Sequence, residues 1–158
     1  MIDEERDEGE RLAGVFQRER EGAERMLDEV AAGQGVRLAP AARAGLSGWL
    51  VGRLIACAHT ALDDHRRRHG AGPPEELAAL LASPLAWRAF LDRFPVVARL
   101  LGQATAAWRG HVLVFLAAVA RDHQRLGGAA EVTDVRVRGG RLHGRRPTLI
   151  VTLAGCAR

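Results

Sequence analysis

The sequence predicts a mainly α-helical protein: a helical bundle through about residue 126, followed by a small antiparallel β meander at the carboxyl end. Two observations carry this prediction. From Val97 to Val119, apolar residues recur at steps of three and four, the period of one helix face. From Thr148 to Leu153, the side chains alternate with the period of a strand. A chain of 158 residues is long enough for one domain with a buried core.

Residues 1–33 predict an acidic amino-terminal helical arm. They hold eleven acids and five arginines, a net charge of −6, whereas residues 34–158 hold eight acids and eighteen arginines, a net charge of +10. A polar helix with a thin apolar stripe is expected over residues 3–32. Gly33 and Gly35 end it, because glycine commonly terminates helices.

Residues 34–126 predict the helical core. Pro40 suits the first turn of a helix that runs to about His69, and Glu75-Glu76 favour the amino end of a short helix after the Gly70–Pro74 loop. The helix that starts at Pro40 has two adjacent apolar stripes, so it belongs between two neighbours. Its stripes are Leu46, Leu50, Leu54, Cys57 and Ala61, and beside them Val51, Ile55, Ala58 and Leu62.

Two more helix starts follow in this core. Ser83 is a favourable N-cap with Pro84 at the first helical position, which predicts a helix to about Arg93. Pro95 begins the longest helix, and Trp108 is expected to be among the most buried side chains because it lies mid-stripe. The stripe consists of Val97, Leu101, Ala104, Trp108, Val112, Phe115 and Val119.

Residues 127–158 predict a β meander that is incomplete at its carboxyl end. Val132, Val135 and Val137 indicate a first strand, and Gly139-Gly140 suit a two-residue hairpin turn. The strand from Thr148 to Leu153 would then leave one edge without a neighbour, and unpaired apolar edges recruit other strands.

Composition restricts the chemistry. The sequence contains no lysine, asparagine or tyrosine. Lysine grips the phosphates in P-loop enzymes and protein kinases, and asparagine holds a kinase Mg²⁺. These routes to phosphoryl transfer are therefore excluded for this chain, as is a lysine Schiff base. The arginines are mostly dispersed, which indicates a solvated surface and makes nucleic-acid binding unlikely.

The compartment is predicted from three absences. Cys57 and Cys156 lack the spacing of a redox motif, which suggests a reduced environment. The acidic amino terminus is not a signal peptide. The longest apolar run, Val112–Ala120, is too short to cross a bilayer. We therefore expect a cytoplasmic protein without a membrane partner.

The histidines offer few candidate sites. His65 and His69 have the spacing of a metal pair on a helix, but three arginines separate them, so a solvated basic helix end is favoured. His111 and His123 flank the apolar stripe of the longest helix and are interpreted as structural hydrogen-bonding residues. His143 differs because of the segment that surrounds it.

The carboxyl-terminal half combines Ser83-Pro84, a helix break at Phe94-Pro95, and a Gly-rich β segment around His143. Between them lie spaced aromatic residues: Trp87, Phe90 and Trp108, with Phe115 and Asp122 after them. Over roughly residues 36–158, this order resembles the amino-terminal part of the dehydratase domain in type II (LanM-class) lanthipeptide synthetases. The resemblance implies a lipid-kinase-like fold that uses ATP and Mg²⁺ to phosphorylate, then eliminate, Ser and Thr in a ribosomal precursor peptide.

The resemblance also suggests residues near the phosphates. In the family, this segment reads Asp-x-His-x-x-Gly-Arg-(Ser/Thr)-Val, in a turn near the bound nucleotide. His143 falls on the family's histidine and Thr148 on its Ser/Thr, whereas Arg141 stands at the aspartate and Pro147 at the arginine. The change to Arg141 reverses the local charge. The alternative, that His143 is a polar residue in an exposed turn, remains open.

We therefore expect a fragment of such a dehydratase, which ends before the family's ATP-contacting lysine strand (roughly Leu-Val-Tyr-Lys-Pro-Arg). By itself it would be a non-catalytic scaffold with no cofactor or metal of its own; ATP and Mg²⁺ belong to the full-length enzyme. The implied partners are the remainder of the synthetase, or a complementing subunit, and the precursor peptide. The alternative is a free-standing basic helical module that binds an acidic protein or a nucleic acid.

Overall fold

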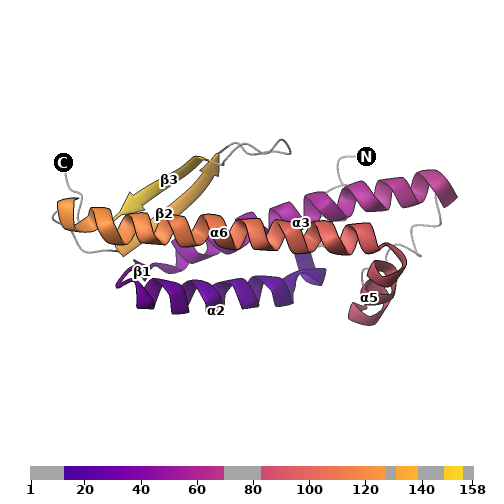
Figure 1. Cartoon of the computed structure of the whole chain (residues 1–158), viewed down its shortest axis with the longest axis horizontal. Coiled ribbons are helices and arrows are strands. Elements are labelled where there is room, and N and C mark those ends of the chain that lie inside the picture. Colours follow the sequence, from indigo (N-terminus) through magenta and orange to yellow (C-terminus); the bar gives the residue numbers. More distant parts are fainter. Residues whose placement is uncertain (1–12, 70–82, 127–130, 139–147, 155–158) are drawn as a thin grey trace. The chain divides into compact units, whose positions relative to one another are not determined.

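The computed structural model describes residues 13–69, 83–126, 131–138 and 148–154. This part of the chain is mainly helical, with one small sheet towards the carboxyl end, as the sequence predicts (Figure 1). Its elements are α2 (Gln17–Gly33), β1 (Arg37–Leu38), α3 (Pro40–His69), α5 (Pro84–Arg93), α6 (Pro95–Leu126), β2 (Glu131–Arg138) and β3 (Thr148–Leu153).

The chain divides into two compact units. The first comprises Met1–Glu19 and Val51–Ala107, and the second comprises Arg20–Leu50 and Trp108–Arg158. Helices α2, α3 and α6 each contribute residues to both.

In the first unit, α5 begins and ends at the residues that the sequence indicates. The Ala86 N–H donates to Ser83 Oγ at 3.4 Å, and Pro84 occupies the first turn, so the predicted N-cap is confirmed. At the other end, the Phe94 N–H donates to Phe90 O at 2.9 Å. Pro95 disfavours a helical conformation at Phe94, so the chain breaks there and restarts as α6.

Aromatic rings form a continuous series in this unit. The rings of Phe16 and Trp87 meet edge to face with centroids 5.7 Å apart. Trp87 stacks on Phe90 at 5.3 Å, and Phe90 lies 4.6 Å from Phe94. Phe16, Trp87 and Phe90 are buried. The aromatic spacing seen in the sequence is therefore that of a packed core, joined by buried aliphatic residues of α3 and α6: Val51, Leu54, Ala58, Leu62, Val97, Leu101 and Ala104.

In the second unit, α2 ends in a glycine cap. Gly35 has φ 67°, its N–H donates to Ala32 O at 3.1 Å, and the Val36 N–H donates to Ala31 O at 2.9 Å. This pair of bonds is the Schellman motif, which satisfies carbonyls at a helix end and favours glycine at the left-handed position. Val36 is buried, and the chain passes directly into β1.

The sheet has the order β1-β2-β3. Strand β2 pairs antiparallel with β3 from Arg138↔Thr148 to Val132↔Leu153, with a bulge between Val132 and Asp134. This pairing matches the two strands expected at the carboxyl end. The short β1, which pairs parallel with β2, was not expected. The predicted turn at Gly139-Gly140 lies outside the described residues.

Helix α3 and strand β2 approach each other at Gly45. A β-carbon added at Gly45 would overlap the carbonyl oxygen of Val135. Val132 and Val135 are both buried. Only glycine permits this distance between a helix backbone and a strand backbone, so Gly45 determines how deeply α3 packs on the sheet.

Trp108 joins α6 to α3 in the same unit. It is 2% exposed, which confirms its predicted burial. Its Nε1–H donates to Leu46 O at 2.9 Å. Next to Leu46, the fully buried Ser47 donates its hydroxyl to Glu24 Oε1 of α2 at 2.9 Å. Buried polar groups are costly unless paired, and both are paired here.

The buried stripe of α6 follows the prediction as far as Val112 and then changes. Leu116 is fully buried, whereas Phe115 and Val119, which the prediction placed on the stripe, are only half-buried. Val112 and Leu116 are four residues apart, so this face of the helix continues through a step of four instead of the expected three.

Gly45→Ala should destabilise the protein. Alanine normally improves a helix interior by about 1 kcal/mol relative to glycine. At Gly45, the overlap with Val135 should reverse this to a net loss of about 1–3 kcal/mol, as overpacking does. Gly52→Ala is the matched control, because nothing lies within 4 Å of its added β-carbon. Urea unfolding measures both; equal effects at the two glycines would contradict the close approach.

Trp108→Ala should lower the free energy of unfolding by about 3–5 kcal/mol, as truncation of large core aromatics does. Trp108→Phe should cost less, because it keeps a ring in the site while losing the bond to Leu46. Denaturant unfolding followed by circular dichroism measures both. A loss below about 1 kcal/mol for the alanine variant, the size of a surface change, would contradict the packing.

Candidate functional site

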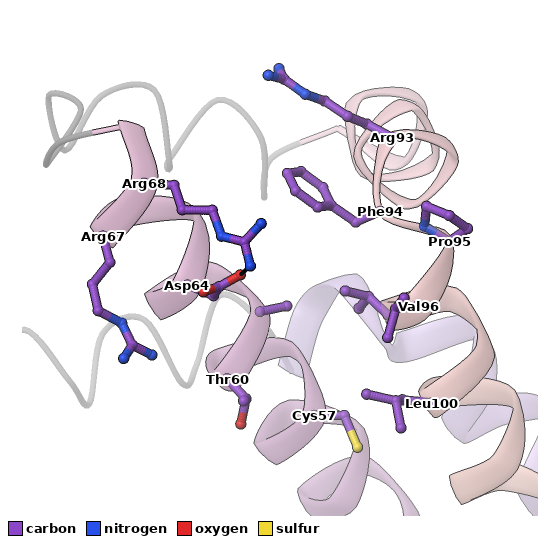
Figure 2. A pocket seen from close by; sticks show the side chains of 12 residues that line it. Cys57, Thr60, Asp64, Arg67, Arg68, Arg93, Phe94, Pro95, Val96 and Leu100 are labelled. Carbon is purple, nitrogen blue, oxygen red and sulfur yellow. Dashed lines mark ion pairs between the residues drawn. The ribbon is translucent and has the colours of Figure 1, made fainter.

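A hollow in the first unit is lined entirely by residues that the structure describes. It lies between α3 and the junction of α5 with α6, and its volume is about 410 Å³ (Figure 2). Helix α3 contributes Cys57, Thr60, Ala61, Asp64, Arg67 and Arg68, and the junction contributes Arg93, Phe94, Pro95, Val96, Val97 and Leu100. The two walls thus come from segments far apart in the sequence.

The floor of the hollow is apolar and open to solvent. Val96 is 57% exposed and Leu100 is 41% exposed, although Val97 between them is buried. Figure 2 shows Val96 and Leu100 on α6 facing the α3 wall, with Cys57 opposite Leu100. Described side chains therefore leave part of the apolar surface of Val96 and Leu100 uncovered in the hollow.

The rim of the hollow is cationic. Arg68 forms an ion pair with Asp64 at 2.8 Å, and the Arg93 guanidinium lies 5.8 Å from the centre of the Phe94 ring. Arg67 donates from Nε to Asp63 O at 3.3 Å, and Figure 2 shows it directed away from α6. Three arginines and one aspartate line the site, which gives it a net charge of +2.

Cys57 has the one perturbed thiol in the described part of the chain. Burial raises the pKa of Cys57, and nearby Arg53 opposes this in part. Because the thiolate is the nucleophile, a raised pKa keeps the group protonated and unreactive at neutral pH. Within the described residues, no cluster of three His, Cys, Asp or Glu side chains could hold a metal ion. The lining can thus bind a ligand through its arginine side chains at the rim and through its apolar side chains at the floor.

Of the three site residues suggested by the family resemblance, Thr148 alone lies in a described segment. Thr148 begins β3 in the second unit, is exposed, and pairs in register with Arg138. Arg141 and His143 lie outside the described residues. Of the other histidines, His123 has Nδ1 2.6 Å from Ala120 O, and His111 meets the ring of Trp49 at 5.9 Å. The contact of His123 matches the structural hydrogen-bonding role predicted for it, whereas the contact of His111 is between rings. The side chains of His65 and His69 are outside the described residues.

The second unit presents a different surface at β3. This strand lies at an end of the sheet, and Ile150 is 48% exposed. The Ala154 N–H donates to Glu131 O at 2.9 Å. Because peptide groups alternate in direction along a strand, Ile150 and Thr152 face β2 as Ala154 does. The peptide groups of Leu149 and Val151 therefore face away from β2, towards the side of β3 on which no strand of the described segments is paired (the open side of β3).

Sequence reasoning missed the hollow but predicted the strand from Thr148 to Leu153, which is β3. The available signal for the hollow was the pair Val96 and Leu100, which are one helical turn apart and lie beside the predicted stripe. Comparison with protein-family models, curated proteins and solved structures finds no match for this chain. None of the helices in the described segments has the length and apolar character needed to cross a bilayer.

Cys57 should react slowly while the protein is folded. At about pH 7.5, iodoacetamide should alkylate it at least about tenfold more slowly than in the urea-unfolded chain, because burial suppresses the thiolate. Mass spectrometry of Cys156→Ser, which leaves Cys57 as the only thiol, measures the rate. Equal rates in the two states would contradict the protonated, partly buried thiol.

Proposed function

We propose that this chain is the helical front part of a LanM-class dehydratase and serves there as a non-catalytic scaffold. The observation that supports this most directly is the open side of β3. Strands with an unpaired side and apolar side chains accept a further strand, since each peptide group gains a hydrogen bond. In the proposal, that strand comes from the remainder of the synthetase or from a complementing subunit.

The second unit is suited to such a role because its sheet is firmly held from within the chain. Val132 and Val135 are buried, and Gly45 lets α3 pack close to β2. Strand β3 is then presented on a supported base. An added strand would complete a sheet that already has one anchored face.

The composition of this chain indicates which part of the enzyme would bind ATP and Mg²⁺. Without lysine or asparagine, this chain lacks the groups that hold phosphates and Mg²⁺ in kinases. ATP and Mg²⁺ would therefore be bound by the whole enzyme, and the substrate would be a ribosomal precursor peptide in the cytoplasm. Thr148, Arg141 and His143 would lie near the bound phosphates, with Arg141 replacing an acidic residue of the family.

The alternative is a free-standing basic helical module. The hollow with its arginine rim favours this second candidate, because such a surface can bind an acidic partner without any added strand. Strand addition at β3 separates the two functions, since only the dehydratase proposal requires it.

Amide exchange tests the proposal. The chain would be extended by about ten residues of the family type Leu-Val-Tyr-Lys-Pro-Arg, and hydrogen exchange measured by NMR. The amides of Leu149 and Val151 should slow at least about tenfold, as amides do when they enter a stable sheet. Ile150 and Thr152 are internal controls, because their amides already face β2.

A second extension of the same composition, with prolines at alternate positions, is the matched control, since proline cannot donate to a sheet. Unchanged exchange at Leu149 and Val151 with the family-type extension would contradict strand addition. The unextended protein should also leave labelled ATP and Ser/Thr-rich peptides unchanged. Reproducible phosphate transfer by this chain would contradict the scaffold role.

A further inference from the structure

We propose that the hollow between α3 and the α5–α6 junction binds an acidic helical segment of another polypeptide. The segment would insert one or two large apolar side chains against Val96 and Leu100 and place carboxylates beside Arg68 and Arg93. This inference does not depend on the dehydratase proposal, because it concerns only residues of the first unit.

The spacing of the exposed apolar residues favours a helical partner. Val96 and Leu100 are four positions apart in the sequence, so they form a ridge one turn long on α6. Both remain substantially exposed beside a hollow whose opposite wall is another helix. A partner helix laid across the mouth of the hollow would present apolar side chains at the same spacing and insert one or two of them, as amphipathic helices do on grooves.

The charge of the rim selects an acidic partner. In the part of the chain that the structure describes, no carboxylate pairs with Arg93 or Arg67. Arg68 is paired with Asp64, but both side chains are well exposed, at 69% and 46%. Exposed ion pairs contribute only about 0–1 kcal/mol, so Arg68 can be shared with an incoming carboxylate at little cost.

The shape and lining disfavour other ligands. The volume of about 410 Å³ falls within the ~300–1,000 Å³ range of ligand sites. Its open floor suits side chains presented by a surface, whereas an acyl chain needs enclosure on most sides. Proteins that bind single-stranded nucleic acids combine a basic groove with exposed aromatic side chains on which the bases stack. Here Trp87 and Phe90 are buried, and Arg93 lies over the ring of Phe94.

Binding can be measured with the whole 158-residue chain and a defined probe. The probe is a fluorescein-labelled synthetic helix of about fourteen residues, built from Ala, Leu and Glu, with leucines three and four apart and glutamates beside them. Fluorescence anisotropy should show saturable binding that weakens as salt is raised, since exposed charge pairs are screened. Peptides with Gln or Arg in place of every Glu test the charge requirement.

Variants locate the site. Val96→Glu should weaken binding at least about tenfold, as loss of a central interface contact does. Val114→Glu is the matched control: Val114 is also exposed on α6, at 73%, but lies outside the hollow. Arg68→Ala with Arg93→Ala should weaken binding and reduce its salt dependence. Circular dichroism and the urea midpoint verify that each variant remains folded.

Several results would overturn the proposal. These are no binding of the acidic peptide, equal binding of the Gln peptide, or equal losses at Val96→Glu and Val114→Glu. Sodium laurate that displaces the peptide and binds as tightly would assign the hollow to acyl chains instead. None of these results affects the exchange test at β3, so the two proposals can fail separately.

Discussion

The packing of the second unit depends on Gly45, which has no side chain. At Gly45, the backbone of α3 lies against the carbonyl of Val135, a distance that any β-carbon would prevent. The next residue, Leu46, offers its carbonyl to the Trp108 indole, so the same turn of α3 holds both the sheet and α6. Because the contacts at Gly45 and Leu46 come from one helical turn, a change in the position of this turn would disturb both the packing against β2 and the hydrogen bond to Trp108.

The sequence was sufficient for elements with a long, regular period or a strong cap. Ser83 with Pro84 and the stripe through Trp108 identified their helices because each signal is local. The strand β1 could not be found this way, since two residues carry no period and its partner β2 lies far along the chain. The buried stripe beyond Val112 could not be predicted either, because tertiary packing determines whether Phe115 or Leu116 is buried.

The two candidate surfaces differed in how far they could be predicted. The strand from Thr148 follows from its alternating apolar side chains. The hollow requires knowledge of which helices meet, and Val96 and Leu100 belong to no predicted stripe. The run that contains Arg67 and Arg68 did not indicate a binding site either. The sequence alone does not distinguish a solvated arginine from one that lines a binding site, because the neighbouring helix is not known.

The two surfaces would recognise partners through different interactions. The open side of β3 offers backbone hydrogen bonds, which are nearly independent of sequence, so selectivity there must come from side chains such as Ile150. The hollow offers side chains only, and its cations are all arginine. A guanidinium presents its N–H groups in a planar fork that matches a carboxylate, so selectivity at the hollow comes from the charge and shape of the partner's side chains.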